Sequence, residues 1–218
     1  MTEDHRRLVV VAGTANVVLH GLGLVLALIA LRPGAPVVPL DRRVDYLSAH
    51  PAGWTLGWGV WILCAIAVVA FLASLRPFAD PPGLGALALK AVLAGAAVDL
   101  ACDVGQIVIL PDRAGALLTV SGLDEFLLWE RRLAVGGLVF ANGLYSIAVL
   151  LAAVALRRVV PWHALLLGLA TFAAGMLLAW TGCTGDMRFL EPATALTFVT
   201  FLPWTIAVTR AIGGGSDT

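Results

Sequence analysis

Leu84–Leu110, with the sequence LGALALKAVLAGAAVDLACDVGQIVIL, decides the fold class of this chain. The run is longer than the roughly 20 residues that a helix needs to cross a bilayer. An aspartate at the centre of such a helix costs about 2.5–3.5 kcal/mol, while each Leu, Ile or Val returns only about 0.3–0.6 kcal/mol. Asp99 and Asp103, with Gln106 one turn further on, are therefore expensive residues. Ionisable groups kept at this depth usually face a bundle interior or a wet cavity, so they indicate a functional site.

The composition places the rest of the chain in a membrane as well. Hydrophobic residues make up 60% of the sequence and charged residues 13%, and the apolar residues form blocks long enough to span a bilayer. The sequence predicts an all-α integral membrane protein, a six transmembrane helix bundle over residues 1–212 with one or two short interfacial helices in the long extracytoplasmic loops. Residues 213–218 are predicted to form a flexible C-terminal tail. The spans are expected at residues 8–31, 54–75, 84–110, 133–156, 162–181 and 192–212.

An even number of spans puts both termini on one side of the membrane. Arginines occur on both sides, but they are denser in the short segments on the side of the termini, which predicts that the termini are cytoplasmic. Arginine greatly outnumbers lysine, and Ala, Gly, Val and Leu dominate the composition. We interpret this composition as that of a GC-rich bacterial genome, and the location as a bacterial inner membrane.

Several function classes find no support in the sequence. The net charge is zero and no basic run occurs, so no nucleic-acid partner is expected. The nucleophile-elbow pattern Gly-x-Ser-x-Gly, the phosphate-binding P-loop and the zinc-ligand spacing His-Glu-x-x-His are all absent from the sequence. We therefore predict no cofactor and no metal, and we assign no catalytic residue.

The acidic pair and the amide are spaced by four and three residues, so their side chains project from one face of the third span. Two ionised carboxylates about 6 Å apart would repel each other by roughly 3 kcal/mol at an effective dielectric constant near 20. We therefore expect at least one of Asp99 and Asp103 to be protonated, ion-bound or paired with a cation.

Two other spans offer polar groups at a similar depth. On the first span Asn16 and His20 lie between small residues that permit close helix contact, and a contact between His20 and Asp99 is geometrically feasible. The fourth span adds polar residues near the middle of the membrane. We predict that the three helices close a pocket that binds a small molecule, an ion or a proton. Its residues are Asp99, Asp103, Gln106, His20, Asn16, Asn142 and Tyr145.

The two long connections carry a second group of polar residues. Residues 41–50 and the capping-box pattern at Ser121–Asp124 predict two short helices, which either cover the outer mouth or only anchor the bundle. The tryptophans at 54, 58 and 61 share one helix face and predict an aromatic belt at the membrane surface. The predicted rim residues are Tyr46, His50, Glu130, Arg131, Arg132 and Asp186.

Three functions fit these patterns. The first is a membrane protein with an intramembrane ligand site, such as a carrier, in which the aspartates bind a small molecule, an ion or a proton. The second is a membrane-embedded enzyme that acts on a lipid or prenyl substrate and uses the aspartate pair for proton transfer. The third is a structural or sensory protein whose polar cluster only holds the helices together. Membrane lipids are the expected partners in all three.

Overall fold

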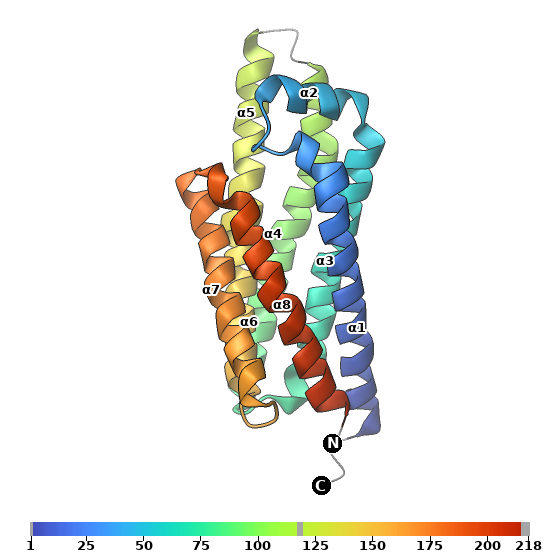
Figure 1. The fold of residues 1–218 in the computed structure, drawn as a ribbon, viewed down its shortest axis with the longest axis vertical. Coiled ribbons are helices and arrows are strands. Elements are labelled where there is room, and N and C mark those ends of the chain that lie inside the picture. The colour runs from blue at the N-terminus through green and yellow to red at the C-terminus, as the bar shows by residue number, and fades with distance from the viewer. Residues whose placement is uncertain (1, 117–119, 215–218) are drawn as a thin grey trace.

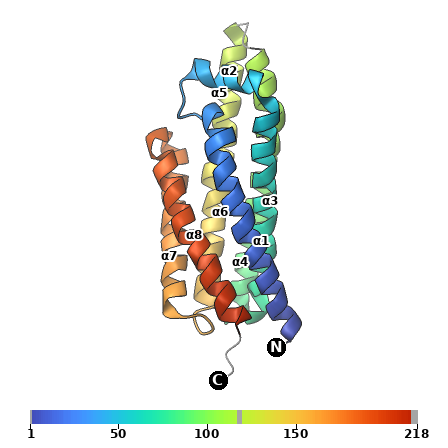
Figure 2. The same cartoon turned by 45° about the vertical axis from the view of Figure 1, so that its right-hand side comes forward.

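The computed structural model describes residues 2–116 and 120–214, and the side chains of all of these except residues 120 and 121. Within those ranges the chain is helical and contains no strand. Six helical segments are long and apolar enough to cross a membrane, which confirms the predicted all-α bundle. Both ends of the described chain lie at the same end of the bundle, here called the terminal end, and the opposite end is called the distal end (Figures 1 and 2).

The six spans follow the chain in order. They comprise α1 (Glu3–Leu26, continued by η1, Ala27–Leu31, and η2, Arg32–Gly34), α3 (Pro51–Leu75, with η3, Arg76–Phe78), α4 (Pro82–Gly115), α5 with η4 and α6 (Val120–Ala134, Val135–Ala141 and Asn142–Ala155), α7 (Trp162–Thr184) and α8 (Leu190–Gly213, preceded by η5, Met187–Phe189). The short helix α2 (Leu40–Ala49) crosses the distal end (Figure 1).

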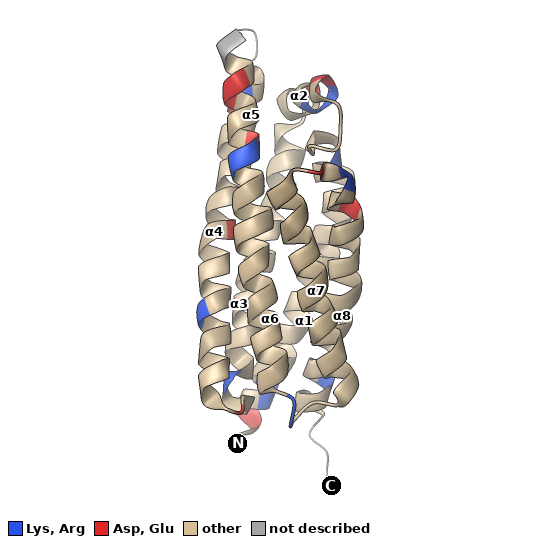
Figure 3. Cartoon of the chain, turned by 90° about the vertical axis from the view of Figure 1, so that its left-hand side faces the viewer, with Lys and Arg blue, Asp and Glu red and all other residues tan. Residues whose placement is uncertain are grey.

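The spans form a closed ring. Each packs against the span before it and the span after it, and α8 completes the ring by packing against α1. Lys, Arg, Asp and Glu gather at the two ends of the bundle, while the helix shafts between them are almost free of charge (Figure 3). This distribution is the one that an apolar bilayer core requires.

The terminal half of the ring has a dense core. Phe71, Trp204 and Val208 are fully buried there, and the Phe71 and Trp204 rings meet edge to face with centroids 5.8 Å apart. Gly13 lets α1 approach α8 closely, because a Cβ atom at this position would collide with the Thr209 side chain. Small residues of this kind are the usual means of close helix contact in membranes.

The distal half is built differently. The interfacial helix α2 packs Leu47 into a second core with Trp54, Leu110 and Phe126. Two spans, the first and the fourth, pass here through π-helical turns at η1 and η4, where the helix is one residue wider per turn. The helix predicted to start at Ser121–Asp124 is α5, and it continues through η4 into α6 as one segment. The Ser121 side chain, on which the predicted capping box depends, lies outside the described residues.

Candidate functional site

A cavity of about 490 Å³ occupies the distal half of the ring. All six spans contribute to its walls, and most of the lining residues are apolar or aromatic. Its volume lies within the range of about 300–1,000 Å³ that small-molecule sites occupy. The polar lining residues include Asp99, Asp103, Gln106, Asn142, Tyr145, His20, Thr194 and Thr197.

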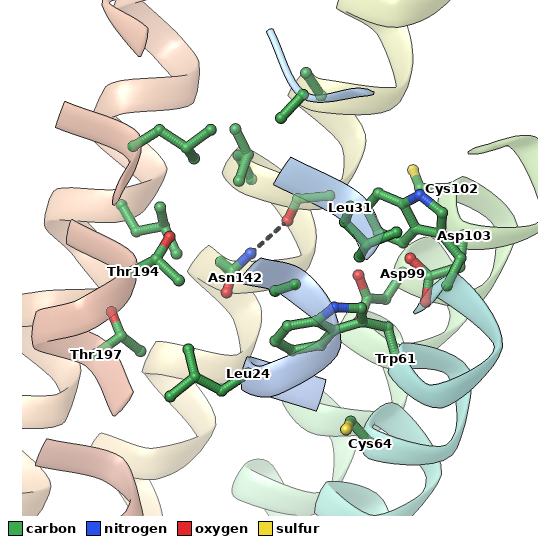
Figure 4. Close-up of a pocket in the computed structure, with 18 of the residues that line it drawn as sticks. Leu24, Leu31, Trp61, Cys64, Asp99, Cys102, Asp103, Asn142, Thr194 and Thr197 are labelled. Atoms are coloured by element: carbon green, nitrogen blue, oxygen red, sulfur yellow. Dashed lines mark hydrogen bonds between the residues drawn. The ribbon is translucent and has the colours of Figure 1, made fainter. Parts of the chain in front are cut away.

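The acidic face of α4 lines one wall of the cavity (Figure 4). Asp103 is 2% exposed, and no group in residues 2–116 and 120–214 donates a hydrogen bond to its Oδ2 atom. The Oε1 atom of Gln106 is also buried without a donor, although the backbone carbonyl of Gln106 accepts a hydrogen bond of 2.7 Å from Trp54 Nε1. A buried carboxylate without a partner is costly in free energy, so this wall lacks hydrogen-bond donors for Asp103 and Gln106.

The fourth span meets this wall through Tyr145. Its hydroxyl donates a hydrogen bond of 3.0 Å to Oδ2 of Asp99. Gly95 makes room for the phenol ring, because a Cβ atom at this position would lie 3.1 Å from the Tyr145 ring. Asn142 also lines the cavity, but its amide donates to the Gly137 carbonyl at 2.8 Å and so closes the π-helical turn of its own span (Figure 4).

Of the two site residues predicted on the first span, His20 lines the cavity and Asn16 does not. Asn16 is fully buried at the contact with α8, where its Nδ2 lies 3.4 Å from Thr205 Oγ1, and it does not line the cavity. His20 does line the cavity, but its Nδ1 bonds to the Asn16 carbonyl at 2.9 Å. The imidazole lies among the rings of Trp61, Phe198 and Phe201, and no hydrogen bond joins it to Asp99 in the described structure.

The three tryptophans of α3 do not form the predicted belt at the membrane surface. Trp54 is 2% exposed, and Trp58 and Trp61 join it in lining the cavity. The helix face that carries them therefore turns into the ring rather than toward lipid. Trp54 and Trp58 meet edge to face at 5.7 Å, and Trp61 meets Phe198 of α8 at the same distance.

The distal rim contains a buried ion pair that the sequence does not reveal. Arg43 of α2 donates a hydrogen bond of 2.9 Å to Glu130 of α5, and the two side chains are 10% and 12% exposed. Arg43 also donates to the Val38 carbonyl at 3.0 Å. Glu130 lines the cavity, so this pair ties the interfacial helix to the cavity wall.

The other predicted rim residues do not converge on one site. Tyr46 donates to the Ala30 carbonyl at 2.7 Å, packs its ring against exposed His50, and has its pKa raised by partial burial. Arg131 is exposed, and the Arg132 guanidinium lies 5.3 Å from the centre of the Trp129 ring. Asp186 bonds to Arg188, and this hydrogen bond lowers the pKa of Asp186. None of these five side chains lines the cavity.

The cavity reaches the surface of the bundle between α1 and α8. These helices touch near the terminal end through Gly13 and Thr209, and α8 runs away from α1 toward the distal end (Figure 1). In the gap, Leu24 of the first span faces Thr194 of α8 across the cavity (Figure 4), and Leu28, which also lines the cavity, is 60% exposed. The walls of the cavity thus include residues of both helices at the gap, among them exposed Leu28.

An ion pair crosses the distal end of this gap. Arg32, in η2, donates a hydrogen bond of 2.6 Å to Glu191, in the first turn of α8. Both side chains are more than half exposed, and both line the outer part of the cavity.

The described residues hold no group of three or more His, Cys, Asp or Glu side chains arranged to bind a metal ion. The arrangement supplies instead a hydrogen-bonded carboxyl group, a second carboxyl group without a partner, and an aromatic and apolar enclosure. No family model matches the chain, and no curated protein or solved structure matches it either. What the site does must therefore be argued from its own geometry.

Proposed function

We propose that this membrane protein binds a small, largely apolar molecule in its intramembrane cavity, with Asp99 and Asp103 holding the polar group of that molecule, as a carrier would. The observation that carries the proposal is the Asp103 carboxyl group, which is 2% exposed, faces a cavity of about 490 Å³ and has no donor in the described structure. A residue kept only to hold helices together would be satisfied by a neighbouring helix.

The shape of the cavity supports the same function. Apolar and aromatic walls with few polar groups are the usual make-up of sites for small organic ligands. The gap between α1 and α8 offers such a molecule a path from the lipid that does not cross the charged ends of the bundle. We further propose a bacterial inner membrane as the location, with the termini in the cytoplasm and the distal end outside.

Photolabelling tests whether the cavity is occupied. Purified protein in nanodiscs of digalactosyldiacylglycerol, an uncharged lipid without an ammonium group, is irradiated with an octanol that carries a diazirine, and the labelled residues are identified by mass spectrometry. We expect saturable labelling of cavity residues on α1, α4 and α8, and protection by excess octanol.

A pair of glycine variants separates the cavity from the rest of the bundle. Gly137 lines the cavity and Gly143 does not, yet a Cβ atom at either position meets nothing within 4 Å. Gly137→Phe fills the cavity and should abolish the labelling, whereas Gly143→Phe should leave it unchanged. Equal labelling of the two variants, or labelling of lipid-facing residues only, would show the proposal to be wrong.

The lateral gap also favours a second candidate, an enzyme that acts on a lipid or prenyl substrate. Asp99, hydrogen-bonded to Tyr145, and unpartnered Asp103 are two carboxyl groups in different surroundings, which suits them to separate acid and base roles. Such an enzyme would convert a lipid in detergent with no gradient across a membrane, and Asp103→Asn would stop the turnover. A carrier would instead show flux into liposomes that Asp103→Asn abolishes.

A further inference from the structure

The charges that line the cavity do not balance, and the imbalance indicates the kind of ligand that fits it. Among the described lining residues, Arg32 is paired with Glu191 at 2.6 Å, and Glu130 is paired with Arg43 at 2.9 Å. These pairs leave the two aspartates of α4 without any cationic partner. The following argument rests on the proposed function, because it concerns the molecule that the same cavity binds.

An unpaired carboxylate in a low-dielectric site strongly favours a positive charge brought to it. The described residues of the protein offer none there. His20 is the nearest candidate on the first span, but its Nδ1 is bonded to the Asn16 carbonyl and its ring lies among aromatic side chains. Asp99 has the Tyr145 hydroxyl as its partner, which is neutral, and Asp103 has no donor in the part of the chain that the structure describes.

A small metal ion does not match the site. Hard cations take six or more oxygen ligands at short range, whereas two carboxyl groups and one amide are all that α4 presents here. The cavity is also far larger than an ion and its bound water need, since water takes about 30 Å³ per molecule. The volume and its apolar walls call for an organic body attached to the charge.

The aromatic residues of the wall suit an ammonium group in particular. Trp58 and Trp61 project from α3 into the same cavity as the aspartates (Figure 4 labels Trp61, Asp99 and Asp103 on one side of it). An organic cation within about 6 Å of an indole ring is attracted by its π-electrons, and tryptophan is the best partner for this contact. Leu24 and Leu28 at the gap would pass the apolar part of such a molecule.

We infer that the cavity binds lipophilic cations, amines or quaternary ammonium compounds with an apolar body, which reach Asp99 and Asp103 from the lipid through the gap between α1 and α8. The charge is held by the carboxyl groups and the indoles, and the apolar body fills the remainder of the cavity.

Competition against the diazirine octanol distinguishes this ligand class from others. Three competitors share an eight-carbon chain and differ in charge: octyltrimethylammonium, octanol and octanesulfonate. In the wild-type protein we expect octyltrimethylammonium to compete and octanesulfonate not to. In Asp103→Asn the half-maximal concentration of octyltrimethylammonium should rise at least tenfold, while that of octanol should change by less than twofold. Because the bilayer is the same for both proteins, differences in partitioning cancel.

Asp112→Asn is the matched control, since Asp112 lies on the same helix with its side chain 75% exposed, and it should leave all three competitors unchanged. Asp99→Asn provides the same comparison should Asp103→Asn fail to fold. The inference is wrong if octanesulfonate competes best, if neither variant weakens octyltrimethylammonium, or if octyltrimethylammonium and octanol weaken in parallel. Each of these results leaves cavity binding intact, whereas the absence of saturable labelling in the wild-type protein would overturn the proposed function itself.

Discussion

The two halves of the bundle, on either side of His20, are packed in opposite ways. In the terminal half, Phe71 and Trp204 interlock, and Gly13 brings α1 against α8. In the distal half the same helices separate around a cavity, two spans widen into π-helical turns, and Asp103 and Gln106 have buried oxygens without donors. Buried polar atoms without a partner occur in both halves, for example Trp204 Nε1 in the terminal half, so the halves differ in packing: one is close-packed, and the other places such atoms beside a cavity.

The largest loss of stability is expected from truncating a side chain of the terminal core. Trp204→Ala removes a fully buried indole that packs against Phe71 and Phe201. The substitution should lower the free energy of unfolding by about 3 kcal/mol, at the lower end of the range for such truncations. Unfolding in mixed micelles of increasing denaturing detergent measures this change. The control is Val199→Ala, at a position that is 69% exposed. If the two variants lost equally little free energy of unfolding, the terminal half would not be the dense core of the bundle.

In the distal half the largest effect should come from the buried ion pair. Glu130→Gln leaves the Arg43 guanidinium buried without its counter-charge and should cost about 3 kcal/mol. Replacing both residues by methionine should recover most of that loss, because no unpaired charge remains. Unfolding of the single and double variants in the same detergent series checks this. A double variant as unstable as the single one would show that packing, not charge, matters at this position.

A smaller effect on stability is expected from removing the hydrogen bond between Tyr145 and Asp99. Tyr145→Phe keeps the ring beside Gly95 and removes only the hydroxyl that donates to Asp99. Hydrogen bonds between membrane helices contribute about 0.6 kcal/mol on average, so stability should change little. Infrared difference spectroscopy should nevertheless show a shifted Asp99 carboxyl band. An unchanged band would mean that the hydroxyl does not bind this carboxyl group.

The smallest effect on stability is expected at the gap. Arg32→Gln breaks an exposed ion pair, and such pairs add little to folding. The melting temperature should not change measurably, but the initial rate of cavity photolabelling should rise at least twofold, since Glu191 no longer holds the gap. Arg188→Gln breaks an exposed pair with Asp186 at the same end of the bundle and is the control. Equal labelling rates in the two variants would contradict a role for Arg32 in access.

Much of the fold could be predicted from the sequence, because bilayer thickness fixes how long an apolar run must be. The six spans follow from that rule, and the polar stripe of α4 follows from helical periodicity. The hydrogen bond between Tyr145 and Asp99 agrees with the similar depth of the two residues. In each case the physical constraint is local or depends only on depth in the membrane.

What could not be predicted depends on how the helices rotate and which ones become neighbours. Tryptophan favours the membrane surface in general, so nothing in the sequence shows that Trp58 faces a cavity. The pair Arg43–Glu130 joins residues 87 positions apart and forms only because α2 folds over the ring. His20 turns toward Trp61 and Phe201 instead of Asp99, since α3 and α8 lie on either side of it. The π-helical turns have no sequence signature of their own, yet both contribute residues to the cavity wall.

The place where the contacts between α1 and α8 end has a mechanical consequence. No loop joins α1 to α8 in the described chain. Their contacts run from the terminal end, at Gly13 and Thr209, to the middle of the bundle, where the His20 ring meets Phe201 at 5.2 Å, and an ion pair joins them at the distal end. Leu28 lies about 12 Å along the helix from His20, and a rotation of about 10° at this contact displaces it by about 2 Å. Widening the gap therefore requires a small change of angle between the first and last helices, with no stretching of a connection and no disruption of the terminal core.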